Sequence, residues 1–132
     1  MKLKEKLQNR QTVFTVELDP PLNLNIEKLL ENIKVYLNQT DAINITDCPL
    51  ASLRMSPIAL SHIVQEHTNL ETIFHITCRD RNLLALKAEL LGAYALGVHN
   101  ILALTGDHPK MGDHPNASAV FDTDSIGLIK II

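Results

Sequence analysis

The chain has 132 residues, of which 45% are hydrophobic, and its 12 basic and 15 acidic residues give a formal net charge of −3. This length suffices for a hydrophobic core, so we expect one domain over residues 1–132. The absence of a basic block and the 4% aromatic content argue against nucleic-acid binding. The most apolar helical segment, residues 83–96, contains Lys87 and Glu89 and is too short to span a membrane. No apolar signal-peptide core follows the N-terminal lysines, and we therefore expect a soluble, cytoplasmic protein.

The first part of the chain alternates between strand and helix patterns. Residues 12–18 are rich in β-branched side chains and end at two prolines, which predicts a strand. Apolar residues at helical spacing predict a helix over residues 26–37. Residues 42–46 form a short apolar run that predicts a second strand. Ser56 followed by Pro57 is the N-cap and first-turn pattern of a helix that runs to about residue 66.

The same alternation continues in the second part. Residues 71–78 predict a third strand, and Asp80 is the expected N-cap of a helix of about seventeen residues that ends at Gly97. The fourth strand is expected at residues 100–104. A long loop over residues 105–122 then leads to a segment, residues 123–132, that has the pattern of a helix start.

Four consecutive strand-helix units predict an α/β fold with a parallel sheet. Because no Gly-x-Gly-x-x-Gly follows the first strand, a dinucleotide-binding doubly wound fold loses its main support. A (β/α) TIM barrel becomes the favoured architecture. Such barrels have eight units and about 250 residues, so we expect an incomplete, half barrel. Its exposed edges predict self-association, as a homo-oligomer or an aggregate.

Two acidic residues stand at predicted strand ends. Glu17 lies near the end of the first strand, and Asp107 follows the fourth strand and Gly106. Ligands of parallel-sheet proteins bind at the carboxyl ends of the strands, so both carboxylates are candidate site residues. A glycine at position 106 permits close backbone approach to a ligand.

Metal binding and disulfide chemistry are not indicated. Cys48 and Cys78 form no C-x-x-C pair, and we expect both to be buried, reduced thiols. The motif Gly-Asp-His-Pro occurs at residues 106–109 and again at residues 112–115. Its loop setting provides no regular ligand spacing, so we expect no metal site and interpret the second copy as a loop or lid element.

Five short motifs follow one another along nearly the whole chain: TVELDPP (15–21), NIT (44–46), HITCRDRN (75–82), ALTGD (103–107) and FDTD (121–124). This ordered set resembles the methylenetetrahydrofolate reductase family, and it is most similar to the reductase portions that some bacteria fuse to a homocysteine methyltransferase. The resemblance implies a TIM barrel that holds FAD at the carboxyl ends of its strands. It also implies hydride transfer from NAD(P)H to the flavin, and from the flavin to 5,10-methylenetetrahydrofolate, which yields 5-methyltetrahydrofolate for methionine biosynthesis.

Position by position, the resemblance assigns catalytic roles to two residues: Glu17 as the general acid that opens the folate ring, and Asp107 as a carboxylate near the flavin and the folate. It assigns cofactor contacts to Thr46, His75, Thr105, Gly106, Asp107 and Asp122.

Two of the departures from the family bear most directly on activity. Thr105 stands where the enterobacterial relatives have arginine, and the second half of the barrel has no counterpart, so we expect the chain alone to be inactive. A non-catalytic, self-associating fragment or subunit and a pterin-binding methyltransferase barrel remain alternatives.

Overall fold

The computed structural model describes residues 2–132. Four parallel strands form one sheet in the order in which they occur in the sequence: β1 (Thr15–Leu18), β2 (Ala42–Ile45), β3 (Glu71–Thr77) and β4 (Asn100–Leu104). Consecutive parallel neighbours joined by helical crossovers are the arrangement of a (β/α) barrel. The expected α/β fold of the partial-barrel type is thus confirmed.

The helices between the strands begin where side chains can cap them. Asn25, Ser56 and Asn82 accept backbone N–H groups at the starts of α2 (Ile26–Lys34), α3 (Pro57–Thr68) and α4 (Leu83–Ala95), respectively. The expected cap at Asp80 is therefore wrong, because the side chain of Asn82 occupies that position and α4 begins two residues later than we predicted. Gly97 has φ of 76° just past the end of α4, as the C-terminal glycine signal indicates.

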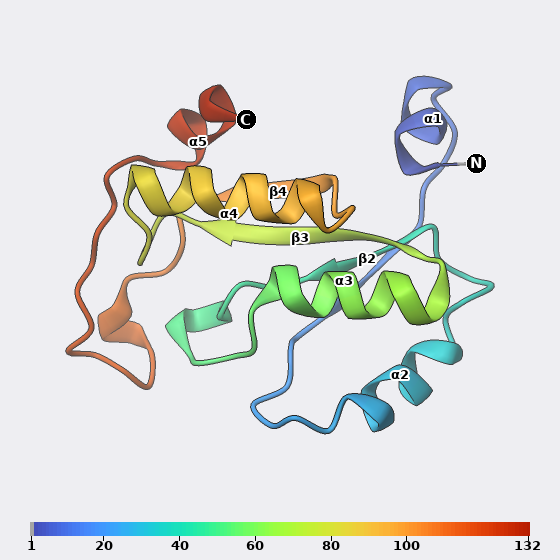
Figure 1. Ribbon diagram of the computed structural model, residues 1–132, viewed down its shortest axis with the longest axis horizontal. Helices are drawn as coiled ribbons and strands as arrows, with labels where there is room; N and C mark the ends of the chain where they lie inside the picture. Colours follow the sequence, from blue (N-terminus) through green and yellow to red (C-terminus); the bar gives the residue numbers. More distant parts are fainter. Residues whose placement is uncertain (1) are drawn as a thin grey trace.

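Two further helices flank the sheet. The helix α5 (Ser125–Ile131) is capped by Asp124 and follows β4. The sequence pattern did not predict α1 (Leu3–Gln8), which lies near the amino ends of the strands (Figure 1). It is held there by an ion pair between Lys6 and Asp41 and by the Leu3 N–H, which donates to Glu71. No helix among residues 2–132 is long and apolar enough to cross a membrane.

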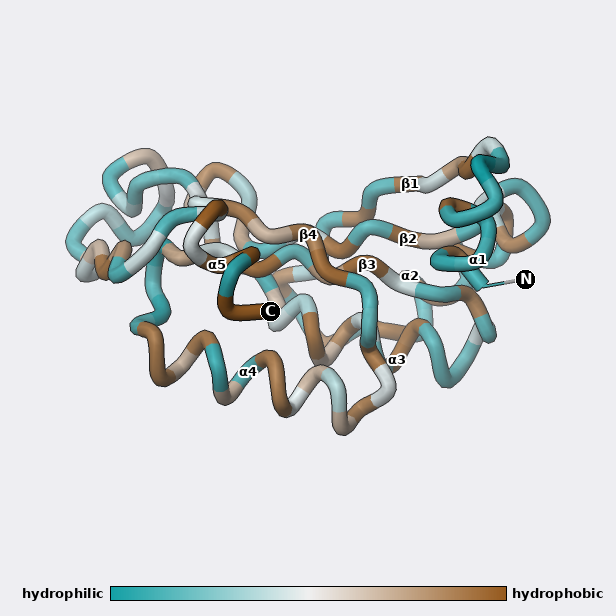
Figure 2. The backbone as a smooth tube through the Cα atoms, turned by 90° about the horizontal axis from the view of Figure 1, so that it is seen from above, coloured by the Kyte–Doolittle hydropathy of each residue, from teal (hydrophilic) through white to brown (hydrophobic). Residues whose placement is uncertain are grey.

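The two faces of the sheet differ in what covers them. Figure 2 shows α3 and α4 on one side of the strands. Side chains on that side form two apolar clusters, which include Ile43 and Ile45 of β2 and Phe74 and Ile76 of β3. Because side chains alternate along a strand, Glu17, Thr46, His75 and Thr77 face the other way. This helix-free face corresponds to the interior of a barrel, and it carries the polar residues.

Two loops extend beyond the carboxyl ends of the strands (Figure 1). One follows β2 and contains the short 3-10 helix η1 (Pro49–Ala51), and the other follows β4 and contains η2 (Pro109–Met111). The second loop is anchored to the end of β3, where Val120 and Phe121 donate backbone N–H groups to the carbonyls of Arg79 and Cys78. Both loops therefore border the strand ends at which ligands of this fold bind.

Candidate functional site

A cleft of about 470 Å³ lies on the helix-free face at the carboxyl ends of the strands. Its volume falls within the range of about 300–1,000 Å³ that is usual for small-molecule sites. All four strands, or the residues directly after them, contribute to it. The lining residues are Glu17, Thr46, Asp47, Pro49, His75, Thr77, Arg79, Leu102, Leu104, Thr105, Gly106 and Asp107.

The structure brings the two candidate catalytic carboxylates to this one cleft. Glu17 is exposed on β1, and within the described part of the chain its side chain makes no hydrogen bond or ion pair that would hold its proton elsewhere. Asp107 is half-buried after β4, and its Oδ2 accepts the backbone N–H of Leu50 at 3.0 Å. Among the described residues, the first carboxyl thus has no partner, and the second is held in place by the η1 loop.

His75 lies deep in the cleft as a neutral imidazole. It is 5% exposed, and burial lowers its pKa below the ordinary value even though the negative charges of Glu17 and Asp47 act to raise it. Its Nε2 lies 3.3 Å from Oδ1 of Asn44, which is a hydrogen-bond acceptor. With the proton on Nε2, the other ring nitrogen, Nδ1, is an acceptor for a ligand.

Two threonines place hydroxyl groups at the cleft. Thr46 is buried at the end of β2, and its hydroxyl donates to Asp19 Oδ1 at 2.7 Å, so its lone pairs remain available as acceptors. Thr105 is exposed after β4, and its Oγ1 accepts the N–H of Ser125 at 3.0 Å. Because that N–H lies in the first turn of α5, Thr105 also ties the cleft to this helix, and its own hydroxyl proton remains free to be donated.

The backbone conformation and the close neighbours of Gly106 both require a glycine at this position. It has φ of 94°, and a Cβ at this position would lie 2.8 Å from Cβ of Thr77 and 3.1 Å from Cβ of Arg79. The glycine lets the loop after β4 pack closely against the end of β3. The close contact with the end of β3 is thus sufficient reason for a glycine here. Gly106 does line the cleft, and its close approach to a ligand stays a prediction.

A charged network at the cleft, centred on the buried Asp47, was not predicted. Asp47 follows β2 directly and accepts both the N–H and the hydroxyl of Thr77 at 2.9 Å. Arg81 donates to both of its oxygens, at 2.6 and 3.2 Å. Arg81 also lies 3.2 Å from Asp80, but its main partner is Asp47. The sequence could have indicated Asp47 as a site residue, because it is a carboxylate at a strand end, like Glu17.

Arg79 brings a second guanidinium to the same region. It is 4% exposed, donates from Nη1 to the carbonyl of Cys48 at 3.1 Å and pairs with Asp80 at 3.4 Å. It lines the cleft together with Thr105, the position at which some relatives carry arginine. The cleft therefore receives a positive charge from the segment after β3. Arg79 was not predicted as a site residue, because the residues after the third strand were interpreted only as a helix start.

Asp122 does not line the cleft. Its Oδ2 accepts the backbone N–H of Leu83 at 3.1 Å, at the start of α4. Its cofactor contact stays a prediction, whereas the other expected site residues, namely Glu17, Thr46, His75, Thr105, Gly106 and Asp107, share the cleft.

The two cysteines are free thiols, as expected. Burial raises the pKa of both Cys48 and Cys78, so both are protonated at neutral pH, but Cys48 is only half-buried. Among residues 2–132, no group of three or more His, Cys, Asp and Glu side chains is arranged to hold a metal ion.

Comparison with known proteins supports an assignment. The family model of methylenetetrahydrofolate reductase matches residues 2–132. A 5,10-methylenetetrahydrofolate reductase of Buchnera aphidicola (subsp. Schizaphis graminum) is 29% identical over 111 residues, which cover 81% of this chain and 38% of that protein. Methylenetetrahydrofolate reductase 2 of Schizosaccharomyces pombe is 25% identical over 133 residues, which cover 98% of this chain and 21% of that protein. The chain thus spans about two-fifths and one-fifth of the length of these relatives. With a matching model over nearly its whole length and a parallel α/β sheet, the chain belongs to the methylenetetrahydrofolate reductase family.

Proposed function

We propose that this chain supplies part of the active site of a flavin-dependent methylenetetrahydrofolate reductase and is inactive alone; the full reductase converts 5,10-methylenetetrahydrofolate to 5-methyltetrahydrofolate with NAD(P)H as electron donor. The observation that supports this most strongly is the convergence of Glu17 and Asp107, from the first and last strands, on one cleft. The same cleft contains Thr46, His75, Thr105 and Gly106. The family relationship gives these residues a substrate class, and the names of both relatives agree with it.

The residues of the cleft fit FAD as the cofactor. Leu102, which is 41% exposed, and Leu104 provide apolar surface on an otherwise polar face. An isoalloxazine ring combines an apolar body with hydrogen-bonding edges, and Thr105 can donate while Thr46 and His75 can accept. These residues would hold the ring, and Arg79 would supply positive charge near it. When bound, the flavin supplies hydride transfer between the nicotinamide and the folate.

The chain's own residues then act on the folate. Glu17 holds a proton on its carboxyl group and donates it to the folate nitrogen whose bond to the bridging carbon breaks when the five-membered ring opens. The ring-opened form carries a positive charge, which the Asp107 carboxylate stabilises because a fixed opposite charge in a partly dry site needs no reorganisation. His75 stays neutral and adds no positive charge that would oppose this form.

The test is whether the purified chain is yellow and oxidises NAD(P)H. It should be measured alone, and then after mixing with the remaining barrel segment of a longer relative. Flavin binding that appears or strengthens on mixing, followed by folate-dependent NAD(P)H oxidation, is the expected result. Folate binding without flavin in either sample would contradict the proposal and favour a pterin-binding methyltransferase barrel.

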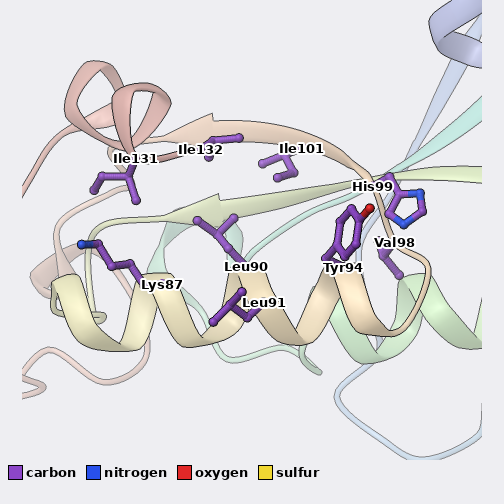
Figure 3. A pocket seen from close by; sticks show the side chains of 9 residues that line it. All are labelled: Lys87, Leu90, Leu91, Tyr94, Val98, His99, Ile101, Ile131 and Ile132. Carbon is purple, nitrogen blue, oxygen red and sulfur yellow. The ribbon is translucent and has the colours of Figure 1, made fainter.

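We also propose that the chain by itself associates with a second copy. β1 and β4 are the edge strands of the described sheet, and parallel edges present unpaired backbone groups. A second feature lies beside β4, where an apolar groove of about 460 Å³ is lined by Leu90, Leu91 and Tyr94 of α4 and by Ile101, Ile131 and Ile132 (Figure 3). Sedimentation at micromolar concentration should show a dimer or larger species, and a purely monomeric chain would contradict association.

A further inference from the structure

Both copies of the Gly-Asp-His-Pro motif contact one and the same segment of the chain. Oδ2 of Asp107, in the first copy, accepts the N–H of Leu50 at 3.0 Å. Both oxygens of Asp113, in the second copy, lie 3.1 Å from the N–H of Leu53. The two aspartates therefore hold the loop after β2 at two points three residues apart.

This loop needs such support because its backbone is strained. Cys48, Leu50 and Ala51 have φ of 46°, 54° and 53°, the left-handed region that residues with a Cβ adopt only at an energetic cost. Conformations of this kind persist only where the surroundings impose them. Arg79 contributes through its hydrogen bond to the Cys48 carbonyl, and the two aspartates bind the rest of the loop.

The glycine of the second copy serves the same contact. A Cβ on Gly112 would lie 1.9 Å from the carbonyl oxygen of Ala51, so only glycine allows the two loops to approach this closely. Asp113 is followed by His114, whose Nδ1 lies 2.8 Å from Asp113 Oδ1. The hydrogen bonds from His114 and from Leu53 lower the pKa of Asp113, so its carboxylate is charged at neutral pH.

We propose that Asp113 is a positioning residue for Asp107: by holding Leu53, it fixes the position of the Leu50 N–H and thereby the direction of the Asp107 carboxylate in the cleft. Asp107 has one oxygen engaged by Leu50, and the other has no hydrogen-bond partner among residues 2–132, so it can accept from a ligand. If the loop moved, the carboxylate would rotate with its hydrogen-bond donor. The catalytic consequence rests on the proposed function, but the coupling between the two aspartates does not.

The coupling can be measured by NMR on the full chain without flavin or folate. In Asp113→Ala, we expect the rate of amide hydrogen exchange at Leu50 to increase about tenfold at neutral pH, together with that at Leu53. The reason is that the strained loop opens more often once the Leu53 amide has lost its acceptor. The carboxyl carbon resonance of Asp107 should shift and broaden. Asp113→Asn, which keeps one oxygen acceptor, should give intermediate values.

Two controls separate this effect from general damage. Glu66→Gln removes one negative charge at an exposed site on α3 and should leave Leu50 and Asp107 unchanged. The exchange of Phe74, in the core of β3, should be the same in all variants, which shows that the fold is intact.

An increase in exchange at Leu53 alone, with Leu50 and the Asp107 resonance as in the wild type, would overturn the proposal. If the coupling is present but Asp107→Asn retains full folate reduction in the assembled reductase, the proposed function fails while the positioning contact stands.

Discussion

The carboxylate of Asp47 and the guanidinium of Arg81 form a two-point ion pair, with Oδ2 2.6 Å from Nη1 and Oδ1 3.2 Å from Nη2. The Asp47 side chain is 2% exposed. Burial alone would lower the pKa of Arg81, but the hydrogen bond and charge of Asp47 raise it above its ordinary value. This pair joins the segment that follows β2, where Asp47 lines the cleft, to the segment that precedes α4.

Asp47→Asn should therefore destabilise the fold by about 3 kcal/mol, because it leaves a partly buried guanidinium without its counter-charge. Urea unfolding followed by circular dichroism would measure the change in the free energy of unfolding. The matched control is Asp80→Asn, which removes an exposed carboxylate 3.2 Å from the same guanidinium and should cost less than about 1 kcal/mol. Equal decreases in the free energy of unfolding of the two variants would show that burial of the Asp47–Arg81 pair does not set its contribution to stability.

Gly106→Ala should be destabilising by at least about 1–3 kcal/mol, both because φ is 94° and because the added methyl group would meet Cβ of Thr77 at 2.8 Å. Gly92→Ala is the control, since it lies inside α4 and a Cβ there meets nothing within 4 Å. That change should stabilise the protein by about 0.5–1 kcal/mol. Thermal unfolding of both variants measures this contrast, and a Gly106→Ala variant as stable as the wild type would argue against the close contact of the loop with β3.

The burial of His75 predicts a pH dependence of stability. Because its folded pKa lies below the unfolded value of about 6.5, the unfolded state binds the proton more tightly. Stability should be complete above pH 6.5 and should decrease as the pH falls from there toward the lowered pKa, by at most about 1.4 kcal/mol per pH unit. The measurement is the free energy of unfolding from pH 7.5 to 5, in the wild type and in His75→Gln. A difference between them that does not vary with pH would contradict the prediction.

Glu17→Gln should separate the two half-reactions of the assembled reductase. Folate reduction should fall about 10²- to 10⁴-fold because the amide cannot donate the proton that opens the ring. Oxidation of NAD(P)H with an artificial acceptor should stay within twofold of the wild type. Stopped-flow absorbance of the flavin measures both steps, with Glu31→Gln, an exposed carboxyl on α2, as the control. Equal loss in both half-reactions would exclude the acid role.

Much of the fold follows from local sequence signals. The strand at residues 100–104 was predicted with its observed limits, and Ser56 with Pro57 marked the start of α3. The first strand begins at Thr15 instead of residue 12, because residues 12–14 precede its pairing with β2. α1 was missed since a short, polar helix has no apolar periodicity, and it is held by distant partners such as Asp41 and Glu71.

The candidate site divides in the same way. Alternation along each strand and the parallel topology suffice to place Glu17, Thr46 and His75 on one face and at one edge, so the sequence by itself determined the polar strand ends and the family resemblance. Which partners those groups meet was decided by the tertiary structure: Asp47 binds Arg81, Asp107 binds Leu50, and Gly106 packs on Thr77. These contacts join residues 29 to 57 positions apart. Local propensity carries no information about them, because they form only when the folded sheet brings separate loops to the same edge.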